Sequence, residues 1–408
     1  MGICRPDDRT LHCGRTTSVL ALIVTVGFLV AVDNTIVAAA AGSIVADLGA
    51  GIGLVPWLGL GYTLPFAALL VFTGPVIDRF GARAVLRWGG AGFTLGALLA
   101  ATAWGTAPLM AGRVAQGVAA AAIVPATLTL LRSALPPAHR SIGAAGWLAA
   151  LACGLAGGPV LGGALSQYLH WRWVFWAVLA CAVVVLLLAG AAPAGQGERT
   201  PRLRRALPEL MRHQTLTGSL LLQALWGIGV TGVAFFTPLA YGELFSVGPG
   251  TAALPLVIVA LAVIAATPLV GRAVRRLGAG AAVAGGLATV AAGLGTLAVL
   301  GNEPAIVPRL AALALVGFGS AFTAPLTTQV LEVVPSRLAG TAAGLLSASR
   351  ELSGAVGVGL AGALVALGPL VDGYTRALAL SAVLTAVAAS LATRLLLPRH
   401  IDEVRKIR

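Results

Sequence analysis

The sequence has little charge. Charged residues make up only 10% of its 408 residues, whereas a soluble domain usually has about 25%. Apolar residues make up 58%, and many form runs long enough to cross a bilayer. We therefore expect an integral membrane protein. The net charge of +13 does not indicate a nucleic-acid partner, because the positive residues lie in short loops between the apolar runs.

Cysteine and histidine are also scarce. The four cysteines show no CxxC spacing and no pairing with histidine, so we expect neither a disulfide framework nor a metal site. The five histidines lie far apart in tails and loops, which argues against a membrane enzyme. A P-loop signature is lacking, so ATP is not the expected energy source. We expect no enzymatic activity and no cofactor.

The apolar runs predict an all-α membrane protein of twelve transmembrane helices in two six-helix halves. The predicted spans are residues 17–40, 54–76, 84–104, 107–132, 141–165, 171–192, 215–240, 250–272, 279–300, 306–331, 338–367 and 374–397. The first run is expected to be retained, since no small-residue cleavage site follows it. The chain then divides into an N-terminal half (1–192), a linker (193–214), a C-terminal half (215–397) and a tail (398–408).

The placement of the basic residues predicts an orientation. Most of the 27 lysines and arginines lie in the two tails, the linker and every second loop. By the positive-inside rule, both termini and the linker are expected on the cytoplasmic side of the cell membrane.

The two halves look related to one another. Gly74-Pro-Val-Ile-Asp-Arg-Phe-Gly81 closes the second predicted span, and Gly271-Arg-Ala-Val-Arg-Arg-Leu-Gly278 closes the eighth. Arg113 begins the fourth span, and Arg309 has a similar place in the tenth. The glycine pairs lie 197 residues apart and the arginines 196. Such a parallel repeat of six-helix halves is typical of alternating-access transporters.

Asp33 lies near the middle of the first predicted span. A carboxylate there costs about 2.5–3.5 kcal/mol on insertion scales, so we expect Asp33 to face polar groups inside the bundle and to carry a proton during transport. Arg113 and Gln116 share one helix face, and protonation of Asp33 would release Arg113. Two alternatives stay open: a permanently protonated Asp33 that bonds a neighbouring helix, and an Arg113 that snorkels to water.

Several stretches resemble motifs of the major facilitator superfamily, and within it the drug:proton antiporters. Residues 32–37 (V-D-N-T-I-V) resemble L-D-x-T-I-V, and residues 113–121 resemble R-x-x-Q-G-x-G-A-A. Residues 74–83 resemble the loop motif G-x-L-A-D-R-x-G-R-K, with Ala82 in place of one basic residue. Residues 154–163 match the antiporter motif G-x-x-x-G-P-x-x-G-G, and residues 344–357 are similar to the eleventh span of the subgroup.

The resemblance implies the major facilitator fold and two working motifs. The loop motif is expected to latch the halves in one state through Gly74, Asp78, Arg79, Gly81 and Arg83. The antiporter motif comprises Gly154, Gly158, Pro159, Gly162 and Gly163. Its glycines at every fourth position form a smooth stripe, and the proline can kink the helix. This suits a moving interface between the halves; ordinary tight packing is the alternative.

Glu351 is the other carboxylate inside a predicted span, and with Asp33 and Arg113 it completes the candidate proton-coupling residues. It is either a second titrating or cation-recognising group, or part of an ion pair that locks the eleventh span. Arg350 projects about 100° away around the helix, so the two need not pair.

Other polar and aromatic side chains are candidates for a substrate cavity. They are Asn34, Tyr62, Gln116, Gln223, Trp226, Phe236 and Arg350. Gln223 and Trp226 share a helix face. Trp57, Trp171, Trp173 and Trp176 are instead expected to anchor the protein at the membrane interface.

Together these features predict a monomeric secondary transporter. It would export small amphiphilic or cationic compounds in exchange for protons by alternating access. One alternative is a proton-coupled importer or uniporter of a small metabolite. Another, of a different class, is a membrane sensor or scaffold that transports nothing.

Overall fold

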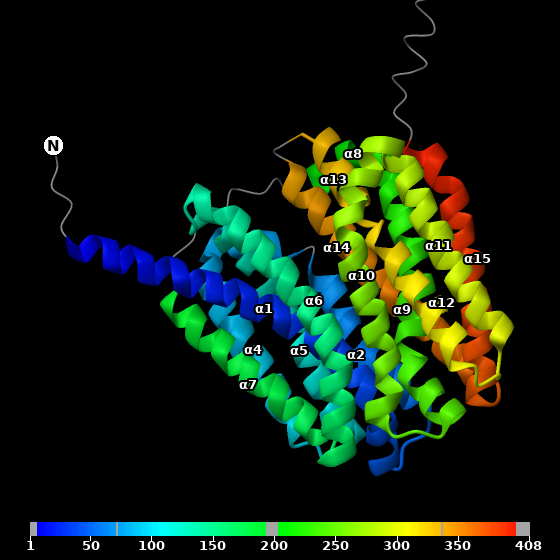
Figure 1. Cartoon of the computed structure of the whole chain (residues 1–408). Helices are drawn as coiled ribbons and strands as arrows, with labels where there is room; N and C mark the ends of the chain where they lie inside the picture. Colours follow the sequence, from blue (N-terminus) through cyan, green and yellow to red (C-terminus); the bar gives the residue numbers. More distant parts are fainter. Residues whose placement is uncertain (1–5, 71, 193–202, 336–337, 397–408) are drawn as a thin grey trace, which may run out of the picture.

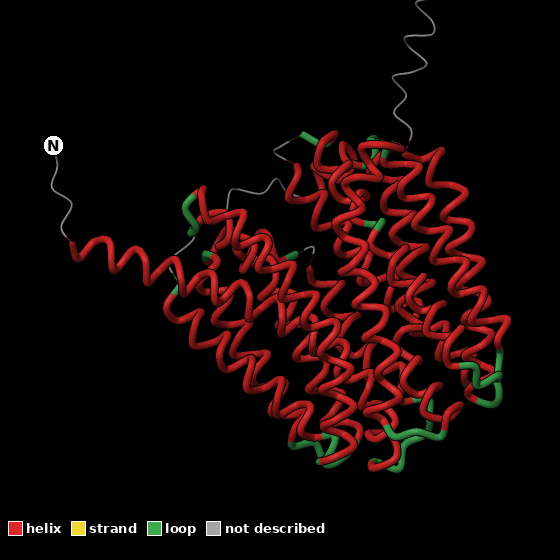
Figure 2. The backbone as a smooth tube through the Cα atoms, in the orientation of Figure 1, coloured by secondary structure: helices red, strands yellow, loops and turns green. Residues whose placement is uncertain are grey.

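The computed structural model describes residues 6–70, 72–192, 203–335 and 338–396, and within these residues the secondary structure is helical, without strands (Figure 2). Helices satisfy every backbone polar group within one segment, as a bilayer requires. The first half comprises α1 (Pro6–Asp47), α2 (Leu54–Leu70), α3 (Thr73–Phe80), α4 (Ala82–Ala101), α5 (Thr106–Ser133), α6 (Pro137–Tyr168) and α7 (Arg172–Ala191).

A short helix, α8 (Leu203–Leu210), precedes the second half and falls within the predicted linker. The second half comprises α9 (Gln214–Phe245), α10 (Pro249–Leu277), α11 (Ala279–Leu300), α12 (Ile306–Ala321), α13 (Ala324–Val333), α14 (Ala339–Val365) and α15 (Leu370–Leu396). The predicted tail (398–408) lies outside the described residues, as does the part of the linker at 193–202.

The described helices account for ten or eleven of the twelve predicted spans by length and composition. Ten are long and apolar enough to cross a membrane, one of them joining α12 and α13, and the pair α2 and α3, bent by 63°, makes an eleventh. The remaining segment is α14, whose 27 residues extend about 40 Å at 1.5 Å per residue. It is the helix that carries Arg350 and Glu351. The first span is longer than predicted, since α1 continues to Asp47.

The repeat predicted from the sequence is visible in the backbone. Gly81, between α3 and α4, has φ 81° and ψ 149°, while Gly278, between α10 and α11, has φ 80° and ψ 159°. Positive φ favours glycine, which explains why both positions carry it. Arg113 and Arg309 are both buried, with 0% and 1% exposure.

The two halves meet at one end of the bundle. Helix α6 packs on α10 and α2 packs on α14, while α1 also contacts α9 and α10. The close contacts join Gly163 to Pro249, Gly362 to Pro56 and Gly42 to Leu239. Figure 1 shows the halves separating from this end toward the end that carries α8 and α13.

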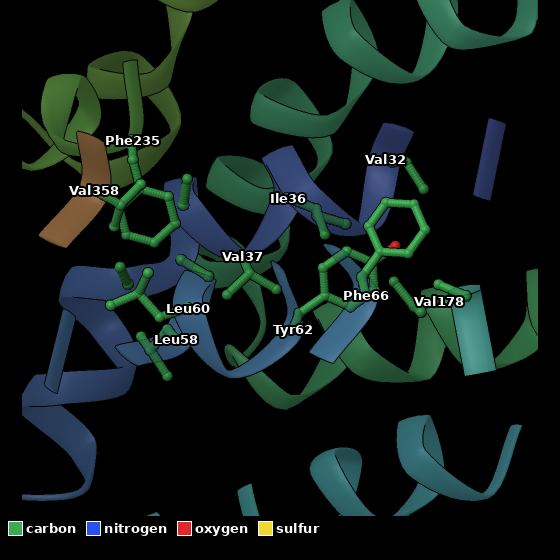
Figure 3. Packing of buried hydrophobic residues seen from close by; sticks show 14 of the residues in the cluster. Val32, Ile36, Val37, Leu58, Leu60, Tyr62, Phe66, Val178, Phe235 and Val358 are labelled. Carbon is green, nitrogen blue, oxygen red and sulfur yellow. The ribbon is translucent and has the colours of Figure 1, made fainter. Parts of the chain in front are cut away.

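One hydrophobic cluster runs through both halves. Figure 3 shows Ile36 and Val37 of α1 beside Tyr62 and Phe66 of α2, with Phe235 of α9 and Val358 of α14 on the side of the second half. The core therefore reaches across the boundary between the halves at this level.

Candidate functional site

The polar centre of the first half is built around Asp33 on α1. Arg113 Nη1 donates a hydrogen bond to Asp33 Oδ2 at 2.8 Å, and Gln116 Nε2 donates to Asp33 Oδ1 at 3.1 Å. Arg113 Nη1 also donates to Gln116 Oε1 at 3.1 Å. All three side chains have 0% exposure. The structure thus contains the predicted contact between Asp33 and Arg113, and Asp33 faces the bundle interior rather than lipid.

Close packing of α2 on α5 brings a further partner to Arg113. A Cβ atom at Gly117 would clash with the carbonyl oxygen of Tyr62, so glycine is what lets the two helices approach this closely. At this separation Arg113 Nε donates to the Leu58 carbonyl oxygen at 3.0 Å. Because a backbone carbonyl carries no residue-specific signal, sequence reasoning could not have found this contact.

Tyr62 packs against the same guanidinium group. The Cζ atom of Arg113 lies 4.9 Å from the centre of the Tyr62 ring, within the range of a cation–π interaction. Tyr62 is fully buried, and neither its hydroxyl oxygen nor Arg113 Nη2 has a hydrogen-bond partner among the described residues. The prediction that Tyr62 lines a substrate cavity is wrong for this conformation, since its ring is part of the packed centre.

The remaining cavity candidates are distributed unevenly. Phe236 and Gln223 are buried, with 1% and 5% exposure, and Gln116 belongs to the centre around Asp33. These three do not line an open cavity here, because their side chains are buried. Asn34 and Trp226 are half-buried, and Trp226 Nε1 donates to Ser320 Oγ at 3.2 Å.

Glu351 and Arg350 form a separate pair on α14. Arg350 Nη2 and Nε lie 3.3 and 3.4 Å from Glu351 Oε1. The helical spacing indicated that the two need not pair, but the long arginine side chain bends back to its neighbour. The Arg350 side chain is 54% exposed and that of Glu351 is 17% exposed. The polar contacts of this pair are to one another, and those of Asp33 are to Arg113 and Gln116.

The loop motif forms α3 and the turn at Gly81. Gly74, Asp78 and Arg79 lie on α3, and the Arg79 guanidinium lies over the Phe80 ring at 5.1 Å. Arg83 donates to the carbonyl oxygen of Gly190 on α7. The Arg83 contact therefore ties the start of α4 to a helix of its own half.

The antiporter motif lies on α6, which continues as one helix through Pro159. Its glycine stripe faces α1: added Cβ atoms would meet the Phe28 carbonyl oxygen at Gly154, the Thr35 side chain at Gly158 and the Ile36 carbonyl oxygen at Gly162. The prediction that this stripe forms the interface between halves is therefore wrong for these three positions. At Gly163, by contrast, a Cβ would lie 2.6 Å from the Pro249 carbonyl oxygen on α10.

Three hydrogen bonds were missed from the sequence. Gln167 Oε1, near the end of α6, accepts a hydrogen bond of 2.9 Å from the Gly250 backbone in the other half. Trp171 is buried rather than interfacial, and its Nε1 donates to Asp47 Oδ2 at 2.8 Å. Arg172 Nη1 also donates to that oxygen, at 3.1 Å. All three join residues that no motif or periodicity connects.

A family model described as the Major Facilitator Superfamily matches residues 23–358. The chain belongs to the major facilitator superfamily. It is therefore a multi-pass membrane transporter of small molecules and not an enzyme, as the sequence predicted.

Relatives found by sequence carry the words export or efflux in their names. The chain is 28% identical to the tetracenomycin C resistance and export protein of Streptomyces glaucescens, over 85% of the chain and 75% of that protein. It is 38% identical to the multidrug efflux pump LfrA of Mycolicibacterium smegmatis over 42% of the chain and 34% of that protein. It is 29% identical to the multidrug export protein EmrB of Escherichia coli, over 43% of the chain and 35% of that protein. The chain thus covers about a third of the length of the last two.

Solved structures confirm the major facilitator fold. A D-xylose–proton symporter superposes with a TM-score of 0.76 at 15% identity, over 94% of this chain and 98% of the symporter. A nucleoside transporter, NupG, superposes with a TM-score of 0.74 at 12% identity, over 93% of this chain and 100% of NupG. At these identities the likeness shows the fold alone.

Proposed function

We propose that this major facilitator protein exports small amphiphilic or cationic compounds in exchange for protons. The observation that carries the proposal is the buried Asp33 carboxylate, which is held by Arg113 and Gln116. An ionisable acid inside a transmembrane bundle marks a functional site, such as a proton relay or a substrate pathway. The names of the relatives, which are export and efflux proteins, support the direction of transport.

The arrangement of the halves supports an inward-facing state. The halves are in contact at the end that holds Gly163 and Pro249, and they separate toward the end that carries α8. The basic linker and tails are cytoplasmic by the positive-inside rule. The transporter then lies in the cell membrane as a monomer that is open toward the cytoplasm.

Asp33 couples the proton to the rocking of the halves. In the inward-facing state its charge is balanced by Arg113 at 2.8 Å, which corresponds to the deprotonated carboxylate. In the outward-facing state Asp33 takes a proton from outside, and the neutral acid no longer holds the guanidinium group. The proton leaves to the cytoplasm when the halves return and the ion pair forms again.

The two motifs act on the same movement. The loop motif at Gly74, Asp78, Arg79, Gly81 and Arg83 latches the cytoplasmic ends when they close. The antiporter motif provides a rigid contact of α6 on α1, and Gly163 extends it to α10.

Transport in proteoliposomes tests the proposal. An imposed proton gradient should drive ethidium movement, and ethidium should drive proton movement, in vesicles with the unaltered protein. Asp33→Asn should abolish the proton movement, because an amide cannot carry the proton. Glu243→Gln, which neutralises an exposed carboxylate near the end of α9, is the matched control and should retain it.

Undiminished proton movement in a folded Asp33→Asn protein would defeat the coupling mechanism. Accumulation of the compound on the proton-releasing side would favour the importer, and no compound-dependent proton movement at all would favour the sensor or scaffold.

A further inference from the structure

We propose that Glu351 is the substrate-recognising carboxylate, that it binds a small organic cation, and that Arg350 is the resident counter-charge which this cation displaces. The inference rests on the proposed export function and assigns its substrate class. It separates two roles: Asp33 carries the proton, and Glu351 contacts the cargo.

Asp33 is closed to a substrate in this structure. Both of its oxygens accept hydrogen bonds, and its exposure is 0%. A cargo molecule could reach the carboxylate only by displacing Gln116 or Arg113, and Arg113 is itself fixed by the Leu58 carbonyl oxygen and the Tyr62 ring. The cargo must therefore be recognised elsewhere.

Glu351 lies where the packed face of α14 gives way to open space. On the face that meets α2, the residues beyond it are buried, with Ala355 at 2% and Val358 at 5%, and Gly362 packs on Pro56. Before it on the same face, Ser347 and Ala348 are half-exposed, and a Cβ added at Gly344 would meet nothing within 4 Å. Glu351 is thus the polar residue at the floor of the opening between the halves.

This face of α14 is not the lipid face. Leu352, Val356 and Leu360 are 52%, 44% and 42% exposed and form one stripe at fourfold spacing. Glu351 precedes that stripe by about 100° around the helix. Arg350 lies a further 100° back, on the side where Ser353 and Gly354 pack against α9. Glu351 therefore faces the first half, and the Arg350 side chain reaches its carboxylate from the side of α9.

The pair is loose enough to be exchanged. The contacts of 3.3 and 3.4 Å are long for an ion pair with hydrogen bonds, where about 2.7–2.9 Å is usual. Exposed pairs of this kind stabilise a protein little. Glu351 is the less exposed partner, so its charge is less screened by water and is the stronger attraction for a ligand of opposite charge.

Helix packing joins this site to the proton site. Tyr62, whose ring packs on Arg113, is on α2, and Glu351 is on α14. These two helices pack on one another across the boundary between the halves.

Two ions of the same shape and opposite charge test the inference. Binding of tetraphenylphosphonium and of tetraphenylborate to the purified full chain is measured in detergent by isothermal titration calorimetry. Glu351→Gln should raise the Kd for tetraphenylphosphonium about tenfold or more. Arg350→Gln should lower it about two- to fivefold, because the competing charge is gone. Glu243→Gln is the matched control and should leave it unchanged.

The two opposite shifts distinguish recognition from damage, since misfolding cannot tighten binding. A Kd for tetraphenylphosphonium that stays within twofold in folded Glu351→Gln would overturn the inference, and so would a wild-type preference for tetraphenylborate. Export of a neutral compound in exchange for protons, without tetraphenylphosphonium binding, would refute the cation site and support the exchange mechanism. Glu351-dependent binding of tetraphenylphosphonium without proton movement would support the cation site and refute the exchange mechanism.

Discussion

Removing the charge of Asp33 should destabilise the fold more than removing Arg113, even though both belong to one ion pair. Asp33→Asn leaves a guanidinium group at 0% exposure that cannot lose its proton. Breaking a buried pair in this way costs about 3–5 kcal/mol. Arg113→Met leaves Asp33, which can take a proton and become neutral. It also removes the hydrogen bond of Arg113 to the Leu58 carbonyl oxygen, so we expect a loss of about 1–3 kcal/mol.

The double variant Asp33→Asn/Arg113→Met should lose less free energy of unfolding than the sum of the losses of the two single variants. It buries no charge, and the remaining amide at position 33 can still bond Gln116. We expect a total loss of about 1–3 kcal/mol and a coupling energy of at least about 2 kcal/mol between the two positions. Reversible unfolding in mixed micelles at increasing dodecyl sulfate, followed by tryptophan fluorescence, measures these free energies.

Arg309 supplies the matched control. It is buried like Arg113, but Glu303 and Gly301 accept its hydrogen bonds through their backbone carbonyl oxygens. The losses in free energy of unfolding caused by Arg309→Met and by Asp33→Asn should therefore add within about 0.5 kcal/mol when the two are combined. Additivity of Asp33→Asn with Arg113→Met, or a larger loss for Arg113→Met alone, would refute this account of the pair.

Two glycine substitutions test the packing of α6. Gly158→Ala should lower the free energy of unfolding by about 1–3 kcal/mol, because the added Cβ meets the Thr35 side chain. The control is Gly157→Ala, whose Cβ meets nothing within 4 Å and which should leave the stability unchanged. Equal losses in the two variants would contradict this packing. Gly163→Val should force α6 from α10 and lengthen the distance between spin labels at Ala46 and Glu243, which are exposed in opposite halves. An unchanged distance distribution would show that this contact does not hold the end closed.

Much of the fold could be predicted from the sequence, because a bilayer leaves helices as the simple solution for long apolar runs. The spans, the six-plus-six division and the repeat of Gly81 and Gly278 follow from composition and spacing alone. The partnership of Asp33 with Arg113 also could be predicted, since a buried charge needs an opposite one and the chain offers few.

The environment of the candidate site could not be predicted to the same extent. Whether Tyr62 and Phe236 line a cavity or pack in the core depends on how the halves sit against each other, which no residue pattern encodes. The helix that the antiporter motif contacts depends on how α6 packs. From the sequence alone, Gly158 could equally have packed against a helix of the other half. Arg350 bends back to Glu351 through side-chain torsions that helical spacing does not specify.

The closed end of the bundle brings glycine against backbone, as Gly163 does against Pro249. Side chains that lock a gate lose rotamer freedom each time it shuts, and glycine has none to lose. Closing the contact at Gly163 therefore orders no side chain there, and reopening it frees none. Such a contact gives only a small entropic preference between the closed and open states of this end. This suits a transporter that must pass through both states in every cycle.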